Sequence, residues 1–225
     1  MPRRLEIALK PELVDAEGQG LCAKARNYFG IELKQVRTVS IVTIDAGFTD
    51  KQYERIKEEI FTNPVTQVSS FDPLPIDADW IIWVGFRPGV RDNQGSTAVE
   101  AIEDLLEVRL GKDEAVYTSK RYCLAGSHLT AEDADRIAGE LLANGIIQQW
   151  KIYSRDDWDP AEGVGYVIPK VILDHTPTVQ TIAVDSDSGL ATVSDQRNLC
   201  LLYTSPSPRD ATSHLVCRLL LEKGG

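Results

Sequence analysis

The sequence has 225 residues, 43% of them hydrophobic, and a formal net charge of −10 at pH 7. This length suffices for one large or two small domains, and the acidic charge argues against a nucleic-acid or anionic-membrane partner. Because no apolar stretch reaches the length of a membrane span and no signal-peptide core follows the first residues, we expect a soluble, cytoplasmic protein that makes no membrane contact.

The cysteines and histidines are too dispersed to suggest a metal site or a disulfide framework. The cysteines have no Cys-x-x-Cys spacing and the histidines do not cluster: they are Cys22, Cys123, Cys200 and Cys217, and His128, His175 and His214. We therefore expect reduced thiols, as is usual in the cytosol, and no zinc.

Residues 4–152 contain an internal repeat. Lys10-Pro11 with Asp15 and Gly18 recurs 77 positions later as Arg87-Pro88 with Asp92 and Gly95. Five further residues recur 81 positions later: Thr49, Arg55, Ile56, Asn63 and Gln67 reappear as Thr130, Arg136, Ile137, Asn144 and Gln148. Two copies of one small unit are the simplest account.

The first copy predicts, in chain order, a strand over 4–9, a helix, a strand over 36–44, a second helix from Thr49 and a strand over 65–69. Pro11 ends the first strand because it cannot donate to a ladder. Thr49 and Gln52 match a capping box, and Asn63-Pro64 stops the second helix. Residues at helical spacing define the apolar faces of the two helices: Leu21, Ala25, Tyr28 and Phe29, then Tyr53, Ile56 and Ile60.

The second copy predicts the same order, with strands over 80–86, 115–125 and 146–152 and helices between them. The long middle strand of each copy could contain a bend. The helices again show apolar residues at helical spacing: Ala98, Ile102, Leu105 and Leu106, then Ala134, Ile137 and Leu141. Asn144-Gly145 stops the last helix.

These elements predict an α+β fold of two tandem β-α-β-α-β units. Because the helices cover one face of each small sheet, the other face needs a cover, and we expect the two units to pack sheet against sheet as a pseudo-dimer. That packing would bury Trp80, Trp83, Phe86 and Trp150. The expected boundaries are 1–76 and 77–155 for the repeats and 156–199 for the beginning of a linker region.

The residues after 155 follow no repeat. Residues 156–165 are rich in turn formers, 166–173 predict a strand, and 190–199 predict the beginning of a helix. Residues 200–225 can be back-translated into DNA that resembles a transposase mosaic end and sequencing-library adaptor, so we expect a non-native tail there. Hydrophobicity alone would instead favour an apolar helix over 215–221.

The sharpest motif is the repeated Lys10-Pro11 and Arg87-Pro88 segment. In a structural interpretation, the proline ends a strand, the aspartate caps a turn or helix and the glycine supplies a permissive backbone. In a functional interpretation, Lys10 or Arg87 binds a ligand phosphate or a partner protein. Duplication favours the structural interpretation.

The other candidate residues also have a structural explanation. Gln67 and Gln148 suit a sheet edge or interface, His128 suits the surface, and Asp174-His175 suits a turn cap more than a metal or acid/base pair. Gly163-Val-Gly165 lacks the rest of a dinucleotide fingerprint, and Asp156, Asp157 and Asp159 suit a solvated loop more than a cation site. No nucleophile, base and oxyanion site is assembled, so we predict no catalytic, cofactor-binding or metal-ligating residue.

Both copies resemble a known module. The first, through residues 4–18 and Phe61-Thr-Asn-Pro-Val-Thr-Gln67, resembles the small, PurS-like subunit of phosphoribosylformylglycinamidine (FGAM) synthase, the amidotransferase of purine biosynthesis. The second resembles it through Gly85-Phe-Arg-Pro-Gly-Val90, Tyr117-Thr-Ser119 and residues 141–148. Tandem modules of this kind form the N-terminus of the large form of the synthase, and 171–179 and 185–194 resemble the start of its linker.

The resemblance implies a role in an ATP- and glutamine-dependent ligase. In that family a glutaminase domain or subunit releases ammonia, ATP with Mg²⁺ activates the amide of formylglycinamide ribonucleotide (FGAR), and ammonia displaces phosphate to give FGAM. The module is implied to join the synthetase core to the glutaminase and to help ammonia pass. The family's ATP, metal and substrate residues lie outside the matched region, so we expect this chain to be inactive alone and to carry no cofactor.

Two other classes of function remain open. The same elements suit a ferredoxin-like regulatory module that binds a small metabolite or a protein partner. Ferredoxin-like sheets can also bind RNA, but that requires exposed aromatic residues in a basic setting, and the net charge of −10 opposes it.

Overall fold

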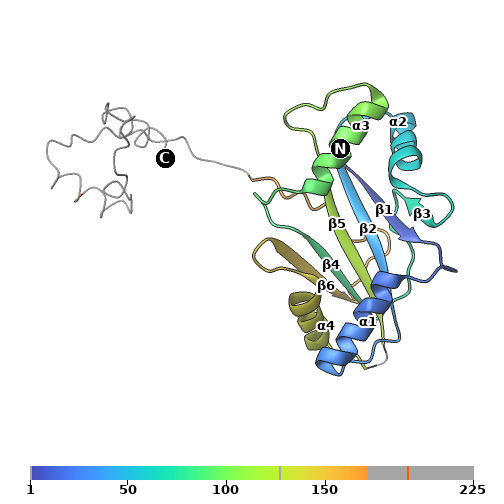
Figure 1. The fold of residues 1–225 in the computed structure, drawn as a ribbon, viewed down its shortest axis with the longest axis vertical. Helices are drawn as coiled ribbons and strands as arrows, with labels where there is room; N and C mark the ends of the chain where they lie inside the picture. Colours follow the sequence, from blue (N-terminus) through green and yellow to red (C-terminus); the bar gives the residue numbers. More distant parts are fainter. Residues whose placement is uncertain (1, 127, 172–191, 193–225) are drawn as a thin grey trace, which may run out of the picture. The chain divides into compact units, whose positions relative to one another are not determined.

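The chain folds into a six-stranded antiparallel sheet whose helices lie on one face (Figure 1). The computed structural model describes residues 2–126, 128–171 and 192. The first half contains β1 (Arg3–Leu9), α1 (Ala16–Phe29), β2 (Gln35–Asp45), α2 (Asp50–Arg55) with its π-helical continuation η1 (Ile56–Phe61), and β3 (Gln67–Ser70). The second half contains β4 (Trp80–Phe86), α3 (Asn93–Leu106), β5 (Ala115–Ala125), α4 (Ala131–Ile137) with η2 (Ala138–Leu142), and β6 (Gln148–Ser154).

The two halves join edge to edge in the middle of the sheet. The strand order is β3-β1-β2-β5-β4-β6. Strands β2 and β5 pair without interruption from Gln35 opposite Ala125 to Asp45 opposite Ala115, with Ser40 opposite Lys120 at the centre. The expected element order and the α+β class are therefore confirmed, and the middle strands contain no break.

The expected packing of sheet against sheet is wrong. Because β2 and β5 satisfy each other's backbone groups, the two small sheets become one, and the described residues form no second sheet over the open face. Trp83 is buried, but under loops, whereas Trp80 and Trp150 are half-buried on the helical face. Phe86 is also only half-buried. The indole Nε1 groups of Trp80 and Trp150 donate to Leu129 O and Asp135 Oδ1.

The helix ends follow the local sequence signals. The capping box of Thr49 and Gln52 is confirmed, and Thr130 with Asp133 forms a second one that the sequence analysis did not identify. Helix α1 ends at Gly30, whose φ of 69° is accessible to glycine. Tyr28 was expected on the buried face of α1, but its side chain is exposed.

The helical face carries two hydrophobic cores, and each combines elements of both halves. In one core, Leu21 and Ala25 of α1 pack with Ile137 of α4 and with residues of β4 and β5. In the other, Ala98 and Ile102 of α3 pack with α2, β1 and β2. Figure 1 accordingly shows α1 beside α4 and α3 beside α2. The first helix of each half thus packs in the core that contains the second helix of the other half.

The opposite face of the sheet is covered by two irregular segments. Leu74 and Ile76 of the connection between β3 and β4, together with Trp158 and Val164, pack on strand residues that include Trp83. The strand expected over 166–173 is not formed in its described part, residues 166–171. Its first residue, Tyr166, lies beside the Arg4 guanidinium instead of pairing in the sheet.

A buried ion pair fastens these covering segments. Arg121 Nη2 lies 2.9 Å from Glu6 Oε2, and both side chains are essentially inaccessible to solvent. Glu6 accepts the Leu74 N–H, and Arg121 donates to the Leu74 carbonyl. Arg4 donates to the Gly165 carbonyl at 2.9 Å. The charged side chains therefore bind the backbone of both segments to the sheet. Removing one member of the buried ion pair would leave the other charge unpaired in the interior, which strongly destabilises a folded protein.

Among the described residues, no helix has the length and apolar character needed to cross a lipid bilayer. The helix expected over 190–199, apart from Thr192, and the segment 200–225 lie outside the described residues.

Candidate functional site

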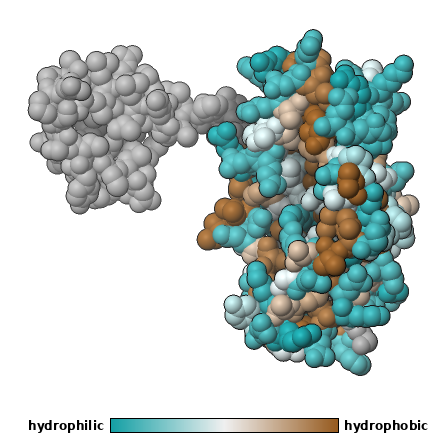
Figure 2. Space-filling view, turned by 45° about the vertical axis from the view of Figure 1, so that its right-hand side comes forward, coloured by the Kyte–Doolittle hydropathy of each residue, from teal (hydrophilic) through white to brown (hydrophobic). Residues whose placement is uncertain are grey.

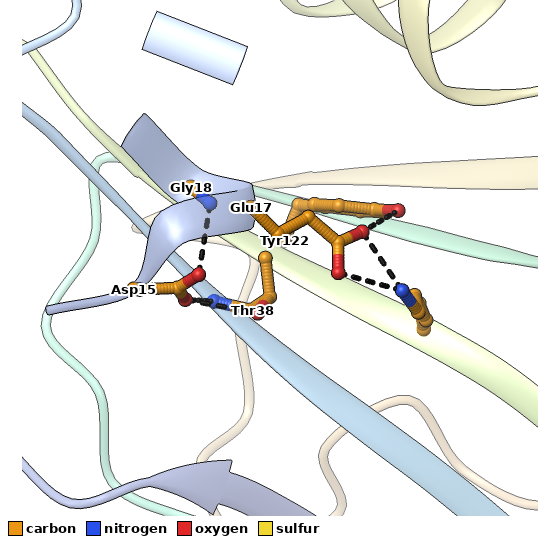
Figure 3. Close-up of polar contacts among 6 residues, drawn as sticks. Asp15, Glu17, Gly18, Thr38 and Tyr122 are labelled. Carbon is orange, nitrogen blue, oxygen red and sulfur yellow. Dashed lines mark hydrogen bonds and ion pairs between the residues drawn. The ribbon is translucent and has the colours of Figure 1, made fainter. Parts of the chain in front are cut away.

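The repeated motif fastens a helix to a neighbouring strand. In the first copy, Asp15 caps α1: its Oδ1 accepts the Gly18 N–H at 2.8 Å (Figure 3). Its Oδ2 accepts both the N–H and the hydroxyl of Thr38 on β2, at 2.7 and 2.9 Å. A Cβ on Gly18 would lie 2.2 Å from the Val36 carbonyl oxygen, so only glycine allows this approach.

The second copy repeats this arrangement. Asp92 accepts from the Gly95 N–H at 2.8 Å and from the N–H of Thr118 at 2.6 Å. A Cβ on Gly95 would lie 2.3 Å from the Val116 carbonyl oxygen. The structural interpretation of the motif is therefore confirmed for its aspartates, which cap the helices. The glycines do not supply the permissive backbone conformation that was expected: their φ angles are not positive, and they instead allow the close approach of a helix to a strand carbonyl. We call this arrangement the helix lock: Asp15, Gly18 and Thr38 in the first half, and Asp92, Gly95 and Thr118 in the second.

Lys10 and Arg87 differ from the rest of the motif because their side chains reach the surface. The Lys10 side chain makes no hydrogen bond or ion pair with any described residue. Arg87 is exposed, and its Nε donates to the Gln148 carbonyl at 2.9 Å. Lys10 and Arg87 are therefore the charged members of the motif that lie at the surface.

Gln67 and Gln148 brace the turns that end the second helix of each half. The side-chain oxygen of Gln67 accepts the Asn63 N–H at 2.8 Å, and that of Gln148 accepts the Asn144 N–H at the same distance. Asn144 in turn accepts the Ile146 N–H. These turns delay the following strands, so β3 and β6 begin two residues later than expected.

The remaining sequence candidates are not brought together. His128 is exposed, as expected. Asp159 accepts the Ala161 N–H at 2.8 Å, and Gly163 and Gly165 have positive φ, so both segments form turns. Asp174-His175 lies outside the described residues. Within the described ranges, no three His, Cys, Asp or Glu side chains are placed to hold a metal ion.

The second half instead contains an open groove that sequence reasoning did not find. The groove has a volume of about 440 Å³ and lies between the end of β4, the start of α3, the centre of β5 and the turn before β6. Its apolar lining includes Val84, Phe86, Val90 and Leu142. Arg91, Gln94, Lys120, Ile147 and Gln148 also line it, and we call it the α3 groove.

At the centre of the sheet, one side of the α3 groove contacts the other half of the protein. Lys120 Nζ forms an ion pair with Glu17 of α1 at 2.7 Å, with both side chains partly exposed. The hydroxyl of the buried Tyr122 donates to Glu17 Oε1 at 3.1 Å (Figure 3). Burial, and then the negative charge of Glu17, raise the pKa of Tyr122 well above its usual range. Tyr122 therefore stays protonated and acts as a donor.

The two cysteines in the described part of the chain, Cys22 and Cys123, are not placed as reactive nucleophiles. Cys123 is buried in β5, and desolvation raises its pKa to about 11. Burial also raises the pKa of Cys22 in α1. Because the thiolate is the reactive form, both side chains act as small hydrophobic residues at neutral pH.

On the face of the molecule that Figure 2 shows, apolar patches lie between hydrophilic residues. The exposed apolar residues include Ile146 and Ile147 at the α3 groove, at 84% and 40% exposure, and Val14 and Val65 in the first half.

Comparison with known proteins identified no relative: a scan against protein-family models and a search of curated proteins both found no match.

Proposed function

We propose that this chain is the scaffold module of an FGAM synthase, joining the synthetase core to the glutaminase. In this proposal the two halves are PurS-like, ferredoxin-like units fused as a pseudo-dimer. Catalysis, ATP and Mg²⁺ belong to the core, and glutamine hydrolysis belongs to the glutaminase. The module holds the two together in the cytoplasm and helps ammonia to pass between them.

The observation that carries the proposal is the shared use of the repeated residues. The resemblance to the PurS-like module rests on the same residues in the same order in both copies. Asp15 and Asp92, Gly18 and Gly95, and the two Asn-Gln braces all serve folding in matching ways.

The test is a reconstitution. The full chain is added to a synthetase core that lacks its own N-terminal module, together with the glutaminase, and FGAM formation is measured with glutamine and separately with free ammonia. We expect the chain to restore glutamine-dependent turnover and to leave ammonia-dependent turnover unchanged. FGAM formation by the chain alone, or no effect on glutamine-dependent turnover, would contradict the proposal.

The α3 groove also favours a second candidate, a regulatory module that binds a small metabolite. A groove of about 440 Å³ with polar and apolar walls is large enough for a small ligand. Under this alternative, glutamine or a purine nucleotide would raise the melting temperature of the chain in a concentration-dependent way. Under the scaffold proposal, the melting temperature stays constant.

A further inference from the structure

The second of the two segments that cover the open face of the sheet lies on it without joining it, and we call residues 158–170 the strap. Inside the strap, the Gly163 N–H donates to the Asp159 carbonyl at 2.8 Å, and the Gly165 N–H donates to the Glu162 carbonyl at 3.3 Å. In the described part of the chain, no backbone–backbone hydrogen bond joins the strap to a strand. Its attachment therefore depends on side chains, and a segment held in this way opens at a lower free energy than a paired strand.

Side chains hold the strap at its beginning, its middle and its end. At the beginning, Trp158 packs edge-on against Tyr153 of β6, with the ring centroids 5.5 Å apart. In the middle, Val164 is only 6% exposed and packs into the apolar cluster of the open face. At the end, Lys170 Nζ lies 2.7 Å from Asp45 Oδ2 of β2.

The strap also covers charged groups. The Arg4 guanidinium donates to the Gly165 carbonyl, and its Nε lies 3.5 Å from Glu6 Oε1. The guanidinium of Arg121 lies 5.1 Å from the ring centroid of Trp158. Among the described residues, Arg4 Nε, Glu6 Oε1 and Arg121 Nε are buried and make no hydrogen bond. When the strap opens, water reaches these groups, and their hydration offsets part of the cost of exposing the apolar contacts.

The internal repeat indicates that the shared fold does not require these charges. The positions of the other half that match the three charged residues are apolar: Ile81, Trp83 and Ile41. Replacing buried ion pairs by apolar residues is often neutral or stabilising. A permanent cover would thus be held better by apolar residues on both sides, and the charges favour a cover that opens.

We infer that the strap is a movable cover, which opens as one unit while the sheet stays folded and so controls access to the open face of the sheet. The chain contains its own reporter of this opening. Cys123 of β5 is 2% exposed and belongs to a cluster against which Trp158 packs. Its thiol is unreactive while the strap is closed and becomes accessible when the strap opens.

The test is labelling of Cys123 with N-ethylmaleimide in the full chain at increasing urea concentrations. Mass spectrometry of the digested protein distinguishes Cys123 from the other cysteines. Labelling through global unfolding rises steeply with urea because global unfolding exposes a large surface, whereas labelling through a local opening changes little. We expect a range of low urea concentrations in which the labelling rate of Cys123 is nearly constant.

Matched substitutions show whether the strap moves as a unit. Val164 and Cys123 belong to different clusters, so Val164→Ala changes the labelling of Cys123 only if the middle of the strap is coupled to its beginning. Val171→Ala is the control, because Val171 is 54% exposed. In the range of low urea, we expect Val164→Ala to raise the labelling rate about tenfold, and Val171→Ala to leave it within about twofold of the original. Lys170→Met, a second variant at the surface, should raise it by about two- to fivefold.

Two results would overturn the inference. If labelling of the unaltered chain rises steeply from the lowest urea concentration, in parallel with global unfolding followed by circular dichroism, the strap does not open separately. If Val164→Ala and Lys170→Met label at the same rate as Val171→Ala, the strap does not move as a unit.

Discussion

The two halves of the molecule use the same residues where a helix meets the sheet and different residues where the surface is open. The helix lock joins Asp15 to Thr38 in the first half and Asp92 to Thr118 in the second, with nearly equal distances. At the rim of the α3 groove, by contrast, Arg91 stands where the first half has Val14. Residues buried at a backbone contact have few alternatives, whereas exposed positions are free to diverge. The comparison therefore separates the positions that the fold requires from those that it leaves free.

The exchange of helices between the two cores makes the halves interdependent, and a cavity should show this most strongly. Ile102 of α3 is fully buried beside β1 and α2 of the first half. We expect Ile102→Ala to lower the free energy of unfolding by about 2–5 kcal/mol. Hydrogen exchange measured by mass spectrometry should show lost protection in β1 and α2 as well as in α3. Loss confined to the second half would show that the halves are independent.

The glycines of the helix lock should give the next largest effect. We expect Gly18→Ala and Gly95→Ala each to destabilise the protein by about 1–3 kcal/mol, because the new Cβ would meet a carbonyl oxygen that cannot move without shifting a strand. Gly20 is a matched control in α1, since its Cβ would meet no atom within 4 Å. Gly20→Ala should stabilise the protein by about 0.5–1 kcal/mol. Urea denaturation measures all three, and equal effects would refute the steric explanation.

The two aspartates of the helix lock differ in burial. We expect Asp15→Ala and Asp92→Ala to lower stability by roughly 1–2 kcal/mol each through loss of the helix cap. Asp15 is buried, whereas Asp92 is half-buried, so water can replace more of the lost hydrogen bonds at Asp92. The loss should thus be larger for Asp15. A larger loss for Asp92 in thermal unfolding would show that burial does not set the order.

The smallest effect is expected for the ion pair that joins the halves at the surface. Glu17 and Lys120 are each more than 40% exposed, so solvent screens their attraction. A double-mutant cycle with Glu17→Gln and Lys120→Met should give a coupling energy below about 1 kcal/mol. The coupling should fall further in high salt. A coupling that is large and independent of salt would mean that the pair is effectively buried.

The order and most of the boundaries of the regular elements could be predicted from the sequence because their signals are local. A helix cap needs only an acceptor at the right offset from backbone N–H groups, as at Thr49 with Gln52, and a proline ends a strand wherever it stands. Because the unit is repeated, most of these signals occur in both halves. The second capping box, which begins at Thr130, was not predicted because the residue three positions later is Asp133 and not the usual glutamate or glutamine.

The tertiary structure alone decided how these elements are combined. Whether β2 pairs with β5 or a second sheet packs face to face depends on long-range backbone pairing, and the same apolar strand residues suit both arrangements. Likewise, the stripe on α1 fits any apolar surface, and only the path of the chain sets it beside α4. The α3 groove unites residues from four separate segments, so no local pattern could reveal it. Local hydrogen bonds determined the individual helices and strands, and packing between distant segments determined how they are arranged.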